Sequence, residues 1–254
     1  MRGRTAPLLF ALALAPTGAM AQATAAPAAP GIADNSFLIE EAYNQEPGVI
    51  QHISSFTRFG EGEWAYTFTE EWPAPSQKHQ LSVTVPLLAA GEHTGIGDAG
   101  INYRYQALDG SRAGVAFSPR LSLLFSTGDA DRGLGNGAAG LQVNLPVSVQ
   151  RGSRFVTHTN LGATWVPSAR GADGATASTR GWNAGQSVIW LARPSLHPLV
   201  ELAWTRAESV VGPDRTESDD ALYLSPGVRW AHNLKSGLQI VPGVAMPIGI
   251  GPSS

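Results

Sequence analysis

The stretch Leu-Gln-Val-Asn-Leu-Pro-Val-Ser-Val at residues 141–149 decides the fold class of this chain. Its odd-numbered positions are all leucine or valine, whereas Gln142, Asn144 and Ser148 lie between them. Because successive side chains of a strand point to opposite faces of a sheet, this alternation predicts a strand with one apolar and one polar face. The polar face carries small uncharged side chains and lacks the lysines and glutamates that are typical of a face turned to water.

The same two-residue period recurs along the chain and predicts eleven strands in all. The other ten span residues 49–59, 63–72, 79–87, 98–106, 115–126, 153–166, 180–192, 195–206, 221–232 and 237–249. Most of these segments exceed the roughly five or six residues of a soluble sandwich strand and match a tilted strand that crosses a bilayer. We therefore expect an all-β fold, an antiparallel transmembrane β-barrel. Because bacterial single-chain barrels have even strand counts, we expect about 12 strands in the intact protein, the last being missing here.

The connections between the predicted strands alternate in length. Those after the fifth, seventh and ninth strands are long, at residues 127–136, 167–179 and 207–220, and the connections between them are short. An outer-membrane barrel has short periplasmic turns and long outer loops, so this alternation favours that class. Six prolines fall inside predicted strands and are expected at bulges, because a closed barrel has no free edge for a residue without an N–H group. They are Pro86, Pro119, Pro146, Pro198, Pro226 and Pro242.

Three parts of the chain differ in composition. Residues 1–21 have the pattern of a secretory signal peptide, with two arginines, an apolar stretch and the small-residue site Ala19-Met20-Ala21. Residues 22–47 are an Ala/Pro-rich lead-in that ends in a candidate plug segment, in which residues 36–47 form either a short helix or a strap. Residues 48–254 are the predicted barrel. This order predicts export to the cell outer membrane of a Gram-negative bacterium.

Net charge and cysteine content exclude several classes of function. The formal net charge is −3, which argues against a nucleic-acid partner, and the chain has no cysteine, which excludes disulfides and thiolate chemistry. No G-x-S-x-G motif is present. His197 and Glu201 share a strand face but lack a third metal ligand. Residues 129–133 resemble the start of a calcium loop but lack the oxygen ligand at the fifth position and the terminal glutamate. We expect no enzyme, no catalytic residue, no metal and no cofactor.

Several segments carry a resemblance to a known family. They are Phe37 to His52, Glu71-Trp72-Pro73, Gly95 to Tyr105, Ser118 to Leu121 and the glycine-rich residues 132–140. Over roughly residues 36–250 the chain resembles the outer-membrane family named for the MetA pathway of phenol degradation. The resemblance implies an outer-membrane β-barrel, with transport assumed for most members. Such barrels usually end in an amphipathic strand that closes on an aromatic residue, and this sequence does not.

Five ionisable residues fall on predicted lumen faces: Arg104, Arg120, His158, Glu201 and Arg229. They form either a charged constriction that selects solutes or a set of interior ion pairs that stiffens the barrel. An unpaired charge away from water is costly, so we expect Arg120 to join a cluster with Glu201 or another lumen acid. Arg104 and Arg229 lie on strands of the opposite direction and are expected nearer the periplasmic mouth.

These observations predict a channel or transporter for passive passage of small, apolar or aromatic, solutes. The alternative is a non-transporting structural or adhesion barrel with a blocked lumen, and a soluble ligand-binding barrel is a third reading. The expected partners are outer-membrane lipid, the barrel-assembly machinery, periplasmic chaperones and a small-molecule solute.

Overall fold

The computed structural model describes residues 8–16, 32, 36–111 and 113–253, and for residues 8–16 it describes the backbone alone. These residues form strands and three short 3-10 helices, Gly60–Gly62, Ala130–Arg132 and Gly251–Ser253. The first strands are β1 (Leu8–Pro16), β2 (Gln51–Arg58), β3 (Trp64–Pro73), β4 (His79–Ala90), β5 (His93–Ile96), β6 (Ala99–Tyr105), β7 (Leu108–Asp109), β8 (Val115–Phe117) and β9 (Arg120–Phe125). The remaining strands are β10 (Gly140–Asn144), β11 (Val147–Arg151), β12 (Phe155–Arg170), β13 (Thr176–Trp190), β14 (Leu196–Gly212), β15 (Arg215–Trp230), β16 (His232–Asn233), β17 (Leu238–Ala245) and β18 (Ile248–Gly249).

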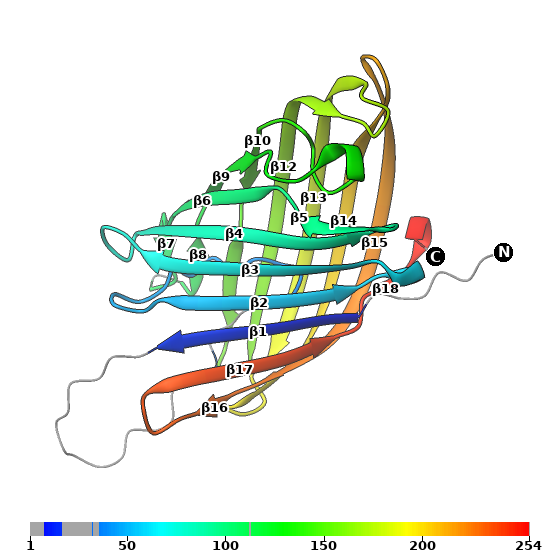
Figure 1. The fold of residues 1–254 in the computed structure, drawn as a ribbon. Coiled ribbons are helices and arrows are strands. Elements are labelled where there is room, and N and C mark those ends of the chain that lie inside the picture. The colour runs from blue at the N-terminus through cyan, green and yellow to red at the C-terminus, as the bar shows by residue number, and fades with distance from the viewer. Residues whose placement is uncertain (1–7, 17–31, 33–35, 112, 254) are drawn as a thin grey trace, which may run out of the picture.

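All 18 strands belong to one sheet, and every pairing in it is antiparallel. Figure 1 shows this sheet curving around an interior. Short strands that continue one another give eleven wall strands: β2, β3, β4, β5–β7, β8–β9, β10–β11, β12, β13, β14, β15–β16 and β17–β18. The predicted all-β antiparallel fold is therefore confirmed. The fold class could be predicted from the alternation of apolar and polar residues, because the local geometry of a strand sends successive side chains to opposite faces.

The sheet formed by β2 to β18 is not closed on itself, and β1 lies in the gap. β1 pairs with β2 through Leu8↔Arg58 to Leu14↔His52, and with β17 through Leu9↔Ala245 to Pro16↔Leu238. Figure 1 shows β1 in dark blue between these two strands. The apolar stretch that predicts a signal peptide thus takes the place expected for a twelfth strand. The predicted cleavage site at residues 19–21 and most of the Ala/Pro-rich lead-in lie outside the described residues.

Prolines inside the sheet sit where the ladder of hydrogen bonds is already interrupted. Pro119 separates β8 from β9, and Pro146 separates β10 from β11. Pro86 and Pro226 lie within β4 and β15, opposite breaks between two short neighbouring strands. Their carbonyl oxygens still accept hydrogen bonds, from the N–H of Gly97 at 2.9 Å for Pro86 and of Met246 at 3.0 Å for Pro226. A missing N–H is tolerated at such bulges.

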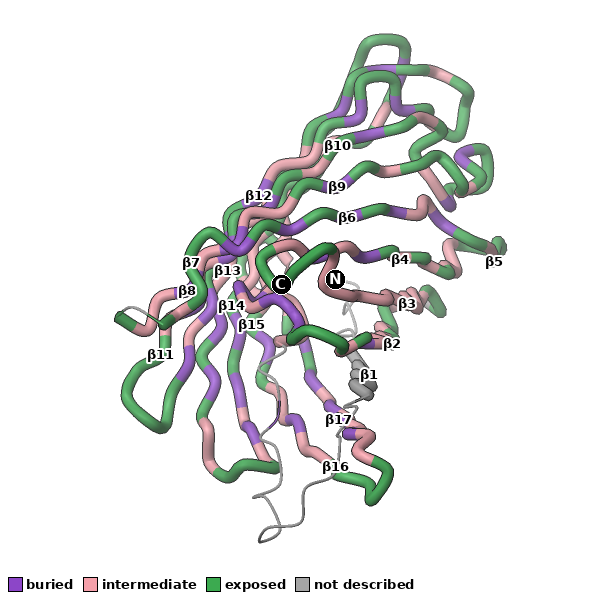
Figure 2. The backbone as a smooth tube through the Cα atoms, turned by 90° about the vertical axis from the view of Figure 1, so that its left-hand side faces the viewer, coloured by how far each residue is buried: buried purple, intermediate pink, exposed green. Residues whose placement is uncertain are grey.

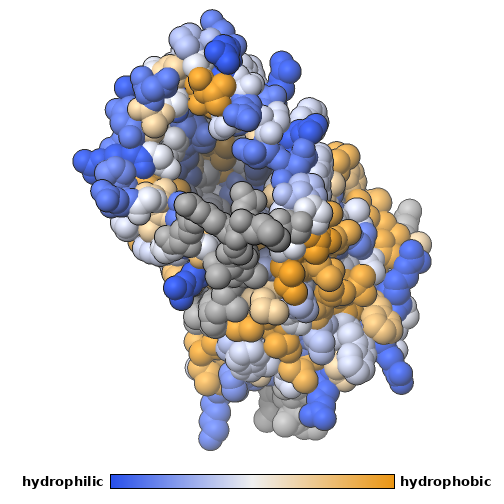
Figure 3. All heavy atoms as spheres, turned by 90° about the vertical axis from the view of Figure 1, so that its right-hand side faces the viewer, coloured by the Kyte–Doolittle hydropathy of each residue, from blue (hydrophilic) through white to orange (hydrophobic). Residues whose placement is uncertain are grey.

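The outer wall is apolar and the interior is polar. Along β10 and β11 the side chains of Leu141 and Val143 are exposed, whereas those of Asn144 and Ser148 are buried. Figure 2 shows buried and exposed residues alternating along the strands in this way. In Figure 3, apolar residues gather on the wall below the projecting hairpins, which are covered by hydrophilic residues. This arrangement is the reverse of a soluble barrel, in which the apolar face points inward.

The prediction of a long loop is wrong at two of the three positions. Residues 167–179 and 207–220 mostly continue the strands, because β12 reaches Arg170 and β14 reaches Gly212 before the chain turns. Both faces of these hairpin ends carry small polar or charged residues, so the alternation that marks the wall disappears there. The third loop is irregular. The carboxylate of Asp98 holds it by accepting N–H hydrogen bonds from Gly128 at 3.0 Å and Asn136 at 2.7 Å.

Candidate functional site

The segment that precedes β2 runs through the interior of the curved sheet. We call residues 36–47 the plug segment. It contains no helix, and its residues Ile39, Ala42 and Gln45 are buried. Side chains from β4 to β15 surround it and take up hydrogen bonds from its backbone. The plug segment therefore occupies part of the interior that the curved sheet encloses.

A single carboxyl group binds the first part of the plug segment. Oε1 of Glu201, on β14, accepts the backbone N–H groups of Phe37 at 3.1 Å, Leu38 at 2.9 Å and Ile39 at 3.1 Å. Glu201 is 1% exposed. Three consecutive N–H groups that converge on one oxygen form a compact anion-binding arrangement of the backbone. Glu201 is thus the principal anchor of residues 37–39.

Polar wall side chains satisfy the backbone further along the plug segment. Asn160 accepts the N–H of Glu40 through Oδ1 at 2.7 Å and donates to its carbonyl oxygen through Nδ2 at 2.7 Å. The N–H of Ala42 donates to Oγ of Ser148 at 2.8 Å, and its carbonyl oxygen accepts from Oγ of Ser118 at 2.7 Å. Buried backbone groups must find partners, and here the wall supplies them in place of a neighbouring strand.

These wall residues lie side by side because the strand register aligns them. The pairs Ser148↔His158, His158↔Ser187, Ser187↔Glu201 and Glu201↔Ser225 form one continuous row across β11 to β15. All five side chains are at most 1% exposed. Within the row, Oγ of Ser148 lies 2.6 Å from Nδ1 of His158. The row gives the interior a polar lining, and its members Glu201 and Ser148 bind the backbone of the plug segment at Leu38 and Ala42.

An ionic cluster holds the middle of the plug segment. The carboxylate of Glu40 accepts from Nε of Arg120 at 2.9 and 3.0 Å, from Nη1 of Arg104 at 3.2 Å and from Nδ2 of Asn144 at 2.7 Å. We call Glu40, Arg104, Arg120 and Asn144 the latch. Burial raises the pKa of Glu40, but the Arg120 and Arg104 guanidiniums outweigh it and leave that pKa below the ordinary value of a glutamate. Glu40 is therefore ionised at neutral pH.

The latch bears on two expectations about the lumen charges. Arg120 lies in an inward charged cluster with an acid, as expected, and among the described contacts that acid is Glu40 of the plug segment and not Glu201. Arg104 and Arg120 are direct partners in the register of β6 and β9, so their expected separation in depth is wrong. Strand direction alone does not fix depth in a barrel, because neighbouring strands are staggered.

The remaining predicted lumen residues also face inward. His158 lies in the polar row described above, and Arg229 lies near the start of the plug segment. Nη2 of Arg229 donates to the carbonyl oxygen of Ser36 at 2.8 Å, and its guanidinium lies 4.4 Å from the centre of the Phe37 ring. The site residue that sequence analysis missed is Glu40. The acidic pair Glu40-Glu41 in an otherwise apolar stretch is the signal that could have indicated it.

Close packing against glycines adds an apolar contact to this anchoring. A Cβ on Gly185 of β13 would overlap Cδ1 of Ile39, whereas a Cβ on Gly181 of the same strand would meet its nearest neighbour at an ordinary 3.5 Å. Phe37 lies in the same way over Gly227 and Gly243. The missing side chains of these glycines leave the room that the apolar residues of the plug segment fill.

We expect Gly185→Ala to loosen the plug segment, because overpacking costs about 1–3 kcal/mol. The chain has no cysteine, so a single Ala42→Cys substitution provides a reporter at a residue that is 0% exposed. Its labelling by a water-soluble maleimide should be roughly tenfold faster in the Gly185→Ala background. Gly181→Ala is the matched control and should leave the rate unchanged. Equal rates in both backgrounds would show that Ile39 does not anchor the plug segment.

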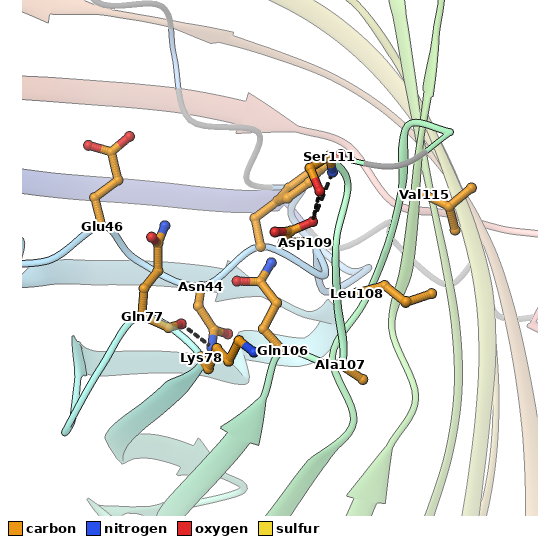
Figure 4. A pocket seen from close by; sticks show the side chains of 11 residues that line it. Asn44, Glu46, Gln77, Lys78, Gln106, Ala107, Leu108, Asp109, Ser111 and Val115 are labelled. Atoms are coloured by element: carbon orange, nitrogen blue, oxygen red, sulfur yellow. Dashed lines mark hydrogen bonds between the residues drawn. The ribbon is translucent and has the colours of Figure 1, made fainter.

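Three cavities adjoin the plug segment. The largest of them, about 860 Å³, lies by Tyr43, Asn44 and Glu46 at the end that carries the short turns, and Lys78 and Asp109 also line it. Figure 4 shows this cavity, with Nδ2 of Asn44 donating to the carbonyl oxygen of Gln77. A second cavity, about 320 Å³, is lined by Glu40 and Arg120 of the latch. A third, about 260 Å³, is lined by residues 36–41 of the plug segment and by Arg104. The plug segment thus borders all three spaces.

Comparison with known protein families finds no match for the chain. No curated protein matches it either. Among the described residues, no helix is long and apolar enough to cross a membrane. Within the same residues, no three histidine, aspartate or glutamate side chains are placed to hold a metal ion together.

Proposed function

We propose that the protein is an outer-membrane channel for passive passage of small solutes and that the plug segment closes it. The observation that supports this proposal is that side chains of the wall hold the plug segment by its backbone. Its backbone binds to polar side chains of the wall and is not paired with a strand of the sheet. Such contacts can be exchanged for water one by one, so the segment can leave while the wall stays intact.

The apolar outer wall supports the membrane location. Large apolar side chains are exposed along successive wall strands, among them Leu161 at 56% and Trp182 at 50%. Exposed apolar patches of this extent are rare on soluble monomers and are typical of a surface in contact with lipid. The signal-peptide pattern of residues 1–21 supports export, and its removal would leave the gap between β2 and β17 without β1. The resemblance to the MetA-pathway family points to apolar or aromatic solutes.

A second function is favoured by the number of bonds that hold the plug segment. Glu201, Asn160, Ser148 and the latch bind it at successive residues from 37 to 42. A segment held this firmly would also suit a non-transporting structural or adhesion barrel with a permanently blocked lumen. The two functions differ in one property, which is whether the plug segment ever leaves.

Membrane fractionation and conductance test the proposal together. We expect the protein to be recovered in the outer-membrane fraction, and we expect single-channel events in planar bilayers to be rare for the wild type and frequent for variants with a loosened plug segment. Recovery as soluble periplasmic protein would refute the membrane location. Silent bilayers for every loosened variant would refute the channel and leave the blocked barrel.

A further inference from the structure

We infer that the latch is a carboxylate-binding site of the lumen, in which Glu40 holds the place of a solute's carboxylate group. The inference rests on the proposed function, since a solute reaches the site only when the plug segment withdraws. Among the small solutes proposed above, it narrows the substrate class to organic acids, which carry a carboxylate on an apolar or aromatic body. Four observations carry it: the fixed position of Arg120, the contacts of Arg104, the local charge balance and the adjoining cavity.

Arg120 is held in place by the wall without help from the plug segment. Its Nη1 donates to Oδ1 of Asn102 at 3.1 Å and to Oγ of Ser122, and its Nη2 donates to Oε1 of Gln142 at 3.0 Å. These three partners lie on β6, β9 and β10. Only Nε of Arg120 is directed at Glu40. When the plug segment leaves, this N–H stays aimed at the vacated space, so the site is preorganised for another carboxylate.

Arg104 behaves differently. Among the described residues, every hydrogen bond of its side chain goes to the plug segment: to the carboxylate of Glu40, the carbonyl oxygens of Glu41 and Tyr43, and Oδ1 of Asn44. Withdrawal of the segment removes all of these acceptors at once. A buried guanidinium without acceptors is costly, so Arg104 will bind the next anion that enters.

The charge balance around the latch also favours an anion. In the closed state Glu40 and Glu71 line the cavity of about 320 Å³ together with Arg120. They also line the cavity of about 260 Å³ together with Arg104, and Glu41 and Arg229 complete its charged lining. Glu71 accepts from Nε2 of Gln80 at 2.9 Å and stays with the wall. Asp98 also lines the cavity, but its carboxylate accepts the N–H groups of the loop after β9. Withdrawal of the plug segment removes Glu40 and Glu41 together and leaves the two guanidiniums of Arg104 and Arg120 in excess over the one carboxyl group of Glu71.

Space for the remainder of such a solute is present beside the carboxylate. The cavity of about 320 Å³ contains Glu40, Arg120, Asn102 and Leu124 in its lining. Cavities that bind small molecules begin at roughly this size. The contacts on the carboxylate come from two guanidiniums and one amide, all of them donors, and this is the set that recognises a carboxylate and rejects a neutral amide of the same shape.

Chemical rescue of a full-length Glu40→Ala variant tests the site without any need for conduction. The substitution removes the carboxylate and leaves the arginines in place, so acetate should fill the vacancy and acetamide should not. We expect acetate to raise the thermal unfolding temperature of Glu40→Ala in detergent and to have no such effect on the wild type. In Glu40→Ala with Arg120→Gln, half-saturation should need about tenfold more acetate, since one charge-assisted bond is lost.

The outcomes separate this inference from the channel function. Equal effects of acetate and acetamide, or equal acetate effects with and without Arg120, would overturn the carboxylate site, whatever the bilayers show. If the double variant fails to fold, direct binding of radiolabelled acetate to Glu40→Ala and to wild type decides, and equal binding overturns the inference. Silent bilayers combined with specific acetate rescue would refute the channel alone, because the site would then bind a carboxylate inside a closed barrel.

Discussion

Glu201→Ala should open the lumen. The substitution removes the one acceptor that three consecutive backbone N–H groups share, and those groups are then left without their partner inside the protein. Loss of such an arrangement costs about 3 kcal/mol of docking free energy, which changes the ratio of open to closed plug roughly a hundredfold. Single-channel events in planar bilayers should become frequent, and maleimide labelling of the Ala42→Cys reporter should accelerate by a similar factor.

Glu217→Ala is the matched control for this experiment. Glu217 lies on β15 near the tip of the β14–β15 hairpin, is exposed, and pairs in register with Ser209 of β14. Its removal deletes a side chain of the same type from the same hairpin. If both variants gave the same conductance and the same labelling rate, Glu201 would not be the anchor, and the closure of the lumen would have another origin.

The second large effect is expected at the latch and depends on pH. Because the docked plug lowers the pKa of Glu40, ionisation of Glu40 stabilises docking fully above the ordinary glutamate pKa, and this stabilisation is lost as the pH falls through the lowered value. The open probability should therefore stay low from pH 7 down to the ordinary range and rise only below it. At neutral pH, Glu40→Gln should mimic this acid state, since it removes the negative charge of the one carboxylate that both guanidiniums contact.

The size of the latch effect is moderate because the groups are not fully buried. The side chains of Glu40 and Arg120 are 23% and 18% exposed. We therefore expect a loss of about 2 kcal/mol, or roughly thirtyfold in the open-to-closed ratio, for Glu40→Gln at pH 7. Bilayer recordings between pH 7 and pH 3 measure it. A wild-type open probability that rose already between pH 7 and pH 5, or a Glu40→Gln variant with the wild-type profile, would contradict the latch.

The wall of the sheet was predictable from sequence because its signal is local. Alternation at residues 141–149 requires only that neighbouring side chains face opposite ways, and the structure has two short strands there, divided by Pro146. The hairpin ends at 167–179 and 207–220 were not predictable in this way. Both of their faces carry polar or charged residues, so neither face differs from the other and the period vanishes.

Only the part of the candidate site that belongs to the wall could be predicted from the sequence. The wall residues Arg104, Arg120 and Glu201 could be assigned to the interior from their place in the alternation. Their partner Glu40 could not, because residues 36–47 have no period and bind through their backbone. The contact between Glu40 and Arg120 spans 80 positions of the chain. Such a contact depends on the stagger of the strands and on the path of the plug segment, and the local sequence determines neither of them.

The wall strands differ in length from one side of the sheet to the other. The strands from β12 to β15 have 15 to 17 residues, whereas β2 and β3 have 8 and 10. At about 3.3 Å per residue and a tilt near 45°, the taller group rises roughly 35–40 Å and the shorter one roughly 19–23 Å. In an outer membrane the rim of the sheet would therefore be uneven, high at β12 to β15 and low at β2 and β3. Diffusing molecules would reach the interior from the side of β2 and β3, on a path almost parallel to the membrane.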